Sequence, residues 1–190
     1  MKTFVALLLV GLMATTALAG LDPDTDSMGI YFDTAGNEVC KDWPPFAPLS
    51  CYLLLANPSA PVCGFECLVR FVGAPHFVLA TTLPPGSLDT DSSVDGFAVG
   101  GTSPFPSTGG PIVLVTWSLM VQSPTPLRFY VSGVNWPGID PWPTVGCFGV
   151  SRRCGVTSGD VNLPVAALNA GCGIVPATVS TFGAIKGLYR

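Results

Sequence analysis

The chain has 190 residues, of which only 11% are charged, and its 12 Asp and Glu residues outnumber its eight Lys and Arg residues, for a net charge of −4. Nucleic acids and anionic membrane surfaces attract basic patches, so this composition excludes both as partners. The length suits one domain with a substantial core.

The first 19 residues predict a secretory signal peptide. Lys2 precedes an apolar run that begins at Phe4, and the run ends with Ala17-Leu18-Ala19 before Gly20. A charged start, a short apolar core and an A-x-A end are the features of such a leader. The run is shorter than the ~18–20 apolar residues that a membrane span needs. We therefore predict cleavage before Gly20 and a secreted chain, extracellular or periplasmic, that has no membrane span. Loss of Lys2 then moves the net charge from −4 to near −5.

The remaining sequence has the pattern of an all-β protein. The chain's 19 prolines and 22 glycines separate short runs rich in Val, Leu, Phe and Thr. Many short strands with turn signals between them are typical of a sandwich or barrel. We predict strands over residues 28–33, 50–56, 64–72, 76–83, 95–100, 111–121, 127–134, 145–151 and 161–167.

Two of these runs alternate clearly between apolar and polar side chains. In residues 64–72, Glu66 and Arg70 face away from the apolar side, as in a strand with one buried face. In residues 111–121, Thr116 and Ser118 lie opposite a continuous apolar face that comprises Val113, Val115, Trp117, Leu119 and Val121. A tryptophan at the centre of such a face belongs to the core.

These elements predict a single antiparallel β-sandwich over residues 20–190, Greek-key-like or jelly-roll-like and stabilised by disulfides. Only the C-terminal segment favours a helix, because Phe182, Ile185 and Leu188 are three residues apart after a cap at Ser180 or Thr181. The two glycines within that segment also allow a packed extended conformation.

All seven cysteines follow the leader, at Cys40, Cys51, Cys63, Cys67, Cys147, Cys154 and Cys172. An exported chain meets oxidising conditions, so all seven are disulfide candidates in a framework of up to three bridges. The odd cysteine is then a free thiol, a link to another chain or a buried residue. A zinc site is disfavoured, because the cysteine spacings lack the tight C-x2-C knuckle.

Four stretches of the chain carry a resemblance to known proteins. They are MGIYFD (28–33), CYLLLANPS (51–59), CGFECLVRF (63–71) and STFGAIKGLYR (180–190). Together they resemble a group of uncharacterised secreted bacterial proteins that share a YFD start, an L-x-N-P-S strand end and a G-[FW]-E-C strand. The strand spacing is similar, more loosely, to β-sandwiches of the cohesin and carbohydrate-binding-module type. That second resemblance implies scaffolding, adhesion or glycan binding, although a fold does not confer a function.

The residues for catalysis are few. His76 is the only histidine, and no G-x-S-x-G motif or histidine pair accompanies it. Glycoside hydrolysis needs two carboxylates, but nothing brings the only glutamates, Glu38 and Glu66, together. We therefore predict no enzymatic activity, with a hydrolase as a remote alternative.

Two acidic loops are candidates for a structural calcium ion, one with Asp22, Asp24, Asp26 and Asp33 and the other with Asp89, Asp91 and Asp95 before Gly96. The first loop departs from an EF-hand, because Ser27 takes the place of the required glycine and no helices flank it. Asp and Gly are also the ordinary residues of turns. No cofactor is therefore predicted, and only weak structural calcium binding is compatible with these loops.

The sharpest binding candidate is the loop around Trp136 and Trp142, in which three prolines and a glycine preclude a regular strand. Exposed aromatic rings stack on sugars or anchor protein partners, and Asn135 and Asp140 would supply polar contacts. The alternative is that the rings fold back over the ends of the core. A similar aromatic loop surrounds Trp43.

These observations predict a secreted, non-catalytic interaction or surface module. Its partner is a glycan, bound through Trp136 and Trp142, or an extracellular protein. The alternative is a structural subunit of an extracellular assembly, which the odd cysteine and the charge-poor strands favour.

Overall fold

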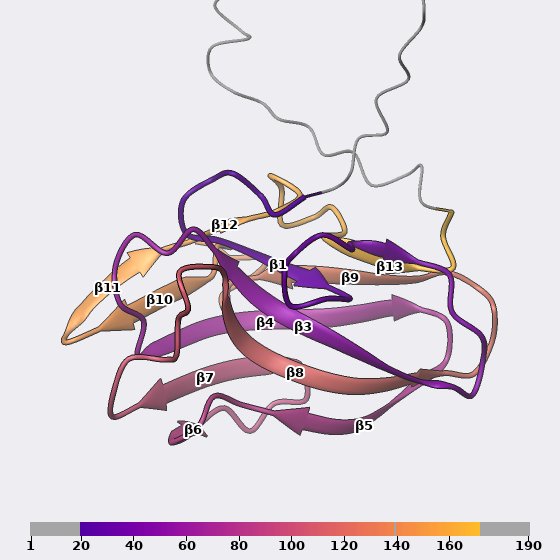
Figure 1. The fold of residues 1–190 in the computed structure, drawn as a ribbon, viewed down its shortest axis with the longest axis horizontal. Helices are drawn as coiled ribbons and strands as arrows, with labels where there is room; N and C mark the ends of the chain where they lie inside the picture. Colours follow the sequence, from indigo (N-terminus) through magenta and orange to yellow (C-terminus); the bar gives the residue numbers. More distant parts are fainter. Residues whose placement is uncertain (1–19, 139, 172–190) are drawn as a thin grey trace, which may run out of the picture.

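The computed structural model describes residues 20–138 and 140–171, and these residues form a sandwich of two β-sheets (Figure 1). They contain no helix, and so none that is long and apolar enough to cross a membrane. The predicted all-β sandwich is confirmed. The predicted signal peptide and the predicted C-terminal helix lie outside the described residues.

The first sheet has five strands. Their order across the sheet is β12 (Gly155–Val156), β1 (Ser27–Tyr31), β3 (Pro48–Ala56), β8 (Ile112–Val121) and β5 (His76–Thr82). All neighbouring pairs are antiparallel except β1 and β12, which run parallel. Strand β5 therefore lies at one edge of this sheet, at the lower margin of the molecule in Figure 1.

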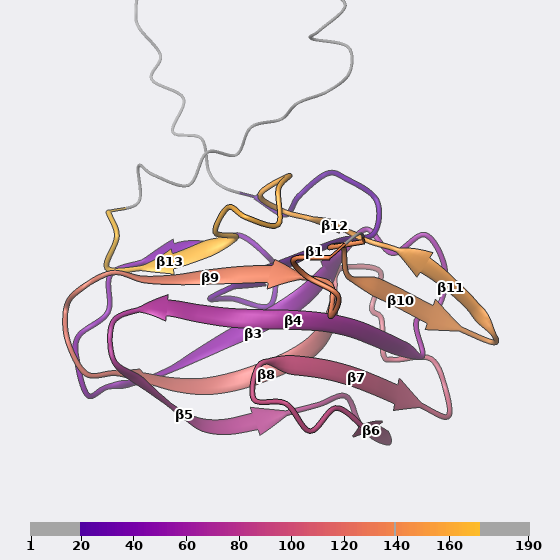
Figure 2. The same cartoon turned by 180° about the vertical axis from the view of Figure 1, so that it is seen from behind.

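The second sheet has eight strands and is seen from its own side in Figure 2. Its main path runs β11 (Val150–Arg153), β10 (Thr144–Cys147), β4 (Gly64–Gly73), β9 (Leu127–Ser132), β13 (Ala166–Leu168) and β2 (Cys40–Lys41). Strand β7 (Gly96–Gly101) pairs with β4, and β6 (Ser87–Asp89) pairs with β7. Strand β4 is thus the centre of this sheet.

Aromatic side chains join the two sheets across the core. Phe71 of β4 contacts Trp117 of β8 edge to face, with ring centroids 5.6 Å apart, and Phe97 of β7 contacts the same indole at 5.8 Å. Such T-shaped contacts add to the free energy that burial of the rings already provides. Trp117 is only 3% exposed, as predicted for a core residue.

Strand β8 departs from the predicted alternation at its beginning. Val113 is half-buried, whereas Ile112 and Leu114 are buried. The pairing register with β3 shifts here, because Val115 pairs with Leu53 and Val113 pairs with Leu54. Leu114 is therefore an extra residue, and a β-bulge of this kind reverses the direction of the side chains that precede it. The prediction of one continuous face from Val113 was wrong for this reason.

The predicted strand 145–151 is a hairpin of β10 and β11. Phe148 and Gly149 both have positive φ, 53° and 79°, as the central residues of a two-residue hairpin turn require. No Asn-Gly or Asp-Gly pair marks this turn in the sequence. The predicted strand 161–167 is likewise wrong over most of its length, because only Ala166–Leu168 pairs with β9. The short strands β2, β6 and β12 were not predicted.

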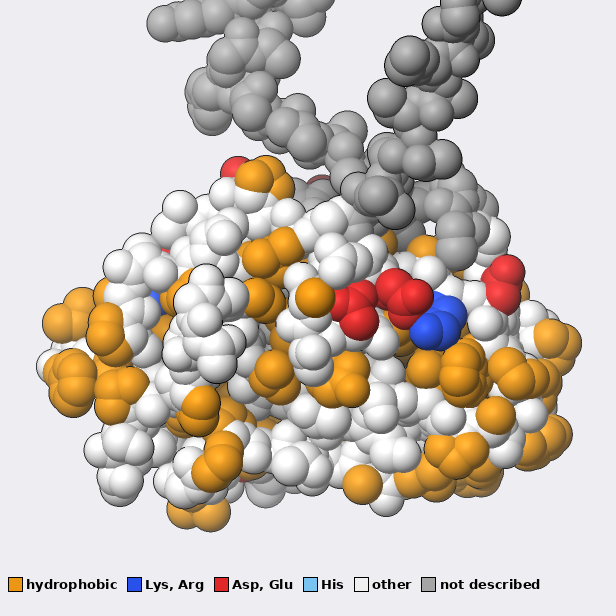
Figure 3. All heavy atoms as spheres, in the orientation of Figure 1, with side chains coloured by type: hydrophobic (Ala, Val, Ile, Leu, Met, Phe, Trp, Pro, Cys, Tyr) orange, Lys and Arg blue, Asp and Glu red, His pale blue; other side chains and the backbone are white. Residues whose placement is uncertain are grey.

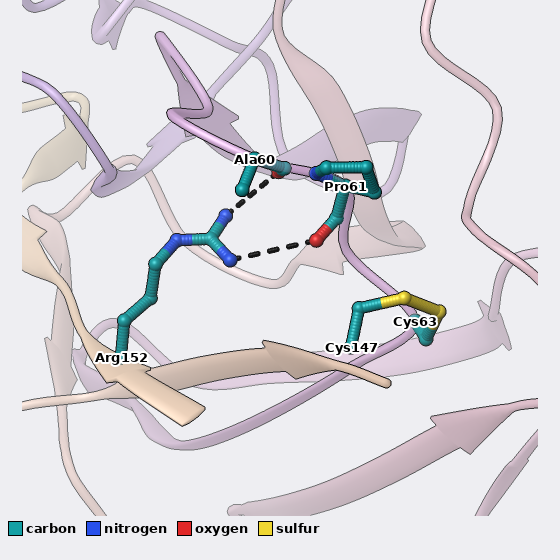
Figure 4. Close-up of a disulfide and its surroundings, with 5 residues drawn as sticks. All are labelled: Ala60, Pro61, Cys63, Cys147 and Arg152. Atoms are coloured by element: carbon teal, nitrogen blue, oxygen red, sulfur yellow. Dashed lines mark hydrogen bonds between the residues drawn. A yellow bond between two sulfur atoms is a disulfide. The ribbon is translucent and has the colours of Figure 1, made fainter. Parts of the chain in front are cut away.

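The hairpin is attached to the segment that precedes β4 (Figure 4). A disulfide joins Cys63 to Cys147, with Cα atoms 4.6 Å apart. On the other strand of the hairpin, Arg152 donates to the carbonyl oxygens of Ala60, at 2.8 Å, and Pro61, at 3.4 Å. These contacts hold β11 beside a loop that is distant in sequence.

The cysteines form fewer bridges than the sequence allowed. Cys51, Cys67 and Cys154 are buried thiols, and they lie in β3, in β4 and directly after β11. Because three of the seven cysteines are thiols, the framework has at most two bridges, which is within the predicted limit of three. Cys40 lies in β2, and Cys172 lies outside the described residues.

Candidate functional site

The candidate site lies on the outer face of the eight-stranded sheet, where three side chains stack. Arg70 of β4 and Tyr130 of β9 are direct cross-strand partners. The guanidinium carbon of Arg70 is 5.1 Å from the centroid of the Tyr130 ring and 3.7 Å from that of Trp136. We call these three residues the Arg70 stack. Because neighbouring side chains of β4 face the core, Arg70 faces outward.

The backbone of the loop 133–143 places Trp136 over this face. The amide of Gly133 donates to the carbonyl of Pro141 at 2.6 Å, and the amide of Trp136 donates to the carbonyl of Gly133 at 3.0 Å. A Cβ atom at Gly133 would overlap the carbonyl group of Trp142, so only glycine allows the two ends of the loop to come this close. The loop is thereby closed at its base.

A side-chain contact from another part of the chain orients the indole. The Nε1 group of Trp136 donates to Oδ1 of Asn162 at 3.2 Å. Asn162 is itself fixed by Asp160, whose carboxylate accepts from the Asn162 amide at 2.8 Å. Trp136 is therefore held from two sides, by Asn162 at its edge and by Arg70 at its face.

Trp142 has a comparable but separate arrangement. The guanidinium carbon of Arg153 is 4.9 Å from the Trp142 ring centroid, and Arg153 also forms an exposed ion pair of 3.5 Å with Asp140. Both tryptophans are half-buried and pack partly against the core. Asn135 is exposed, and its carbonyl accepts a hydrogen bond from the Gly138 amide.

The predicted binding residues thus lie in two groups, Asn135 with Trp136 and Asp140 with Trp142. In each group an arginine lies over one face of the tryptophan ring. Arg70, Tyr130 and Arg153 had no predicted binding role. The alternation of β4 predicted that Arg70 faces outward, but the register that places it opposite Tyr130 was not visible in the sequence.

A depression of about 450 Å³ lies on the same sheet over β7, β4 and β10. Glu66 lines it from β4, four residues before Arg70, with Ala98 and Thr144 as its cross-strand partners. The outer face therefore combines an exposed carboxylate and an arginine of β4, a tyrosine of β9 and a tryptophan of the loop 133–143.

The residues weighed for catalysis lie on different elements. His76 is in β5, where its Nδ1 atom is 2.9 Å from the carbonyl oxygen of Ala74 and its ring contacts Phe71. Glu66 is on the outer face of β4, and Glu38 pairs with Lys41 at 2.7 Å. Among the described residues, no contact joins any two of these three side chains.

One carboxylate in each acidic loop accepts hydrogen bonds from nearby backbone amides. Asp33 accepts hydrogen bonds from the amides of Ala35 and Glu38, and Asp89 accepts from those of Asp91 and Ala98. Over residues 20–138 and 140–171, no three His, Cys, Asp or Glu side chains form a group that could hold a metal ion. Weak calcium binding stays a prediction.

Comparison with known proteins identifies the fold. No protein-family model matches the chain, and neither does any curated protein. Among solved structures, the chain is similar to the sixth cohesin of scaffoldin B from Acetivibrio cellulolyticus, solved in complex with a Cel5 dockerin. The TM-score is 0.51 at 12% identity, over 75% of this chain and 96% of that one. A cohesin module of a family 33 glycoside hydrolase from Clostridium perfringens has a TM-score of 0.41 at 11% identity, over 69% and 97% of the two chains. The looser of the two predicted resemblances is confirmed at the level of the fold: the chain is a cohesin-like β-sandwich.

Proposed function

We propose that this chain is an extracellular, non-catalytic module that binds a protein partner through the outer face of its eight-stranded sheet. The observation that carries the proposal is the Arg70 stack. Trp, Tyr and Arg are the residue types most enriched among those that dominate the energetics of protein interfaces. Here one of each is present, and Arg70 contacts both rings on the outer face of the sheet.

The chemistry of the stack suits a protein surface. A guanidinium over an indole keeps its terminal N–H groups in its own plane, where they can donate to carboxylates or carbonyls. The two rings beside it provide rigid apolar area that loses little conformational entropy on binding. Glu66 adds an acceptor of opposite charge on the same strand, and such mixed charge gives an interface its orientation.

The fold agrees with a role in protein binding. The similar cohesin from Acetivibrio cellulolyticus was solved in complex with a dockerin, which is a protein partner. At 12% identity this likeness concerns the fold alone, so it supports the class of function and leaves the partner open.

The experiment that tests the proposal uses the mature chain, residues 20–190 without the predicted leader, as bait for secreted proteins of the producing organism. The affinity of the recovered partner is then measured. We expect Arg70→Ala and Trp136→Ala each to weaken binding by about thirtyfold or more, the effect of losing a dominant interface residue. The matched control is Lys41→Ala in β2, an edge strand of this sheet, which removes the cation 5.4 Å from the Trp43 ring and leaves the Arg70 stack intact. Equal affinities for all four proteins would contradict the proposal.

Glycan binding through Trp136 and Trp142 is the second candidate, because both rings lie beside exposed polar residues, Asn135 and Asp140. A sugar stacks on a ring face, and Arg70 occupies one face of Trp136. Binding to insoluble polysaccharides would therefore be lost in Trp136→Ala and Trp142→Ala but kept or improved in Arg70→Ala. If Arg70→Ala loses affinity for the recovered protein and no form of the chain is retained on polysaccharide, the protein partner is favoured.

The other predicted role, a structural subunit of an extracellular assembly, would give a stable oligomer in size-exclusion chromatography. The three thiols of the described residues do not support a covalent version of it, because all three are buried. An oligomer that survives dilution without a further partner would favour the structural role over the binding module.

A further inference from the structure

A second surface of the molecule lies at β5, the edge strand of the five-stranded sheet. Within β5, Phe77 is 51% exposed, Val78 is 46% exposed and Leu79 is 50% exposed. The strand contains no Lys, Arg, Asp, Glu or Pro. Natural edge strands ordinarily carry such residues, which prevent the addition of another strand.

The other edges in the described part of the chain differ from β5. Strands β2 and β12 have two residues each, β6 has three and includes Asp89, and β11 carries Arg152 and Arg153. With seven uncharged residues, β5 is both the longest edge and the least protected one. Figure 3 agrees: on the face that includes β5, charged side chains gather away from the lower margin, where hydrophobic and uncharged side chains lie.

The backbone of β5 presents unpaired groups at this edge. The amide of Gln122 donates to the carbonyl of Pro75, so the pair of residues 75 and 122 is a hydrogen-bonded pair of the antiparallel ladder. Hydrogen-bonded and non-bonded pairs alternate in such a ladder. His76 and Val78 therefore direct their N–H and C=O groups away from β8, toward the free edge.

A groove of about 360 Å³ follows the inner side of the same strand, between the two sheets. Its floor contains core rings, those of Phe71, Phe97 and Trp117. Val78 lines it on the β5 side, and the opposite side carries Asp89 and Asp95. The sandwich is thus open along this side, with apolar rings below and carboxylates at the rim.

Contacts within the chain fix the position of the acidic rim. The carbonyl of Asp95 accepts from the Val69 amide at 2.7 Å, and the Asp89 carboxylate accepts from the Ala98 amide at 2.9 Å. Gly96 fits closely against Asp91 and Ser93, where a Cβ atom would overlap both side chains. The loop from residue 89 to 96 is therefore fixed against β4 and β7, at a set distance from β5.

We propose that β5 and this groove accept an extended peptide segment of a partner protein as an additional strand. Its backbone would pair with His76 and Val78, alternate apolar side chains would enter the groove above Trp117, and a Lys or Arg would face Asp89 and Asp95. Strand addition of this kind obtains affinity from main-chain hydrogen bonds and specificity from the pockets for alternate side chains. The site goes beyond the proposed function, because it lies on the other sheet from the Arg70 stack.

The charge of the rim and the strand register of β5 favour a partner segment at this edge over a second copy of this chain. A second copy would bring its own Asp89 and Asp95 to an already acidic rim, and like charges across an interface are unfavourable. The extra residue Leu79 also shifts the register between Val78 and Ala80. A bulge in both copies would limit pairing between two β5 strands to their first residues.

The test uses a synthetic probe, a fluorescein-labelled nine-residue peptide in which valine alternates with threonine between terminal lysines. Fluorescence anisotropy measures its Kd for the mature chain. We expect the same peptide with terminal glutamates to bind at least about tenfold more weakly, because of the acidic rim. We also expect N-methylation of the residues that pair with β5 to abolish binding, and Asp95→Asn to reduce the preference for lysine over glutamate.

A pair of variants locates the probe on the molecule. Val78→Lys places a charge on the proposed edge and should weaken binding about tenfold or more, whereas Val150→Lys makes the same change at an exposed valine of edge strand β11 and should leave binding unchanged. In the free chain, the His76 and Val78 amide protons should exchange rapidly with solvent, and the bound probe should protect them. Arg70→Ala should bind the probe normally, which separates this site from the proposed interface.

Several outcomes would overturn the proposal. They are no binding up to the solubility limit of the peptide, equal affinity of the N-methylated peptide, and equal effects of Val78→Lys and Val150→Lys. Concentration-dependent dimerisation that Val78→Lys abolishes would assign the edge to a second copy instead. None of these results would depend on whether the Arg70 stack binds a protein.

Discussion

Arg70 shows how one residue acquires a role from its surroundings. Its Nε atom is buried and has no hydrogen-bond partner among the described residues, because the rings of Tyr130 and Trp136 cover it. Stacking on aromatic faces compensates part of the lost hydration, and guanidinium is hydrated weakly enough for this arrangement. A lysine at this position would lose both the planar stacking and the directed donors.

Asp26 is the residue whose charge contributes most clearly to stability. It is buried, and its carboxylate accepts hydrogen bonds from Arg152 Nε at 3.0 Å and from the hydroxyl of Ser59. Burial by itself would raise the pKa of Asp26, but the hydrogen bonds and the positive charge of Arg152 hold that pKa below its ordinary value. The ionised form is therefore stabilised by folding.

This shift predicts a pH dependence of stability. A lowered pKa in the folded state adds stability that is complete above the unfolded value of about 3.9 and is lost as the pH falls through the folded value. Urea unfolding between pH 2.5 and pH 7 should therefore show a steeper acid loss for the wild type than for Asp26→Asn. The exposed Asp24→Asn is the control. Parallel curves for the wild type and Asp26→Asn would contradict the assignment.

The partner of Asp26 gives a second prediction at the residue scale. Arg152→Ala leaves a buried carboxylate without its cation and frees the carbonyl oxygens of Ala60 and Pro61. We expect the free energy of unfolding at pH 7 to fall by about 2–4 kcal/mol. The control Arg153→Ala removes an exposed pair and should cost less than about 1 kcal/mol. A loss no larger in Arg152→Ala than in Arg153→Ala would show that the buried contacts contribute little.

At the scale of elements, the β10–β11 hairpin depends on a covalent link. Its strands have only four residues each, and Phe148 at its tip is 79% exposed. The disulfide between Cys63 and Cys147 spans 84 residues of sequence and ties the hairpin to the start of β4. A cross-link over so long a segment lowers the entropy of the unfolded chain considerably.

Removal of this disulfide should therefore destabilise the protein. The double variant Cys63→Ser and Cys147→Ser is expected to lose about 2–5 kcal/mol in the free energy of unfolding. The measurement is chemical denaturation without reductant, with circular dichroism as the probe. A change below about 0.5 kcal/mol would mean that the backbone pairing of β10 with β4 holds the hairpin without the link.

At the scale of the whole molecule, the three buried thiols report on the integrity of the sandwich. Burial raises the pKa of Cys51 and of Cys154 to about 12, and burial likewise raises that of Cys67. The thiolate is the reactive form of cysteine. A thiol that is both buried and protonated should react only when the two sheets separate.

Thiol labelling tests this expectation directly. In a neutral buffer we expect the reagent to modify none of Cys51, Cys67 and Cys154 in the folded protein and all three in denaturant, as located by peptide mapping. The labelling rate should follow global unfolding as denaturant increases. Modification of any one of them within minutes in native buffer would show that its part of the core opens separately.

The sequence by itself determined the class of fold. Alternation in β4, with Glu66 and Arg70 outward, depends on neighbouring residues alone and was predicted correctly. Trp117 was likewise assigned to the core from its position in an apolar run. These features are local, because the period of a strand repeats every two residues whatever it pairs with.

Only the tertiary structure decided the register, the partners and the candidate surfaces. The bulge at Leu114 and the bridge between Cys63 and Cys147 depend on strands that are distant in sequence. The same is true of Trp136, which the sequence presented as a ring on a loop and the fold placed against Arg70. Such contacts follow from how complete strands pack, because one shift of register moves every side chain to the other face.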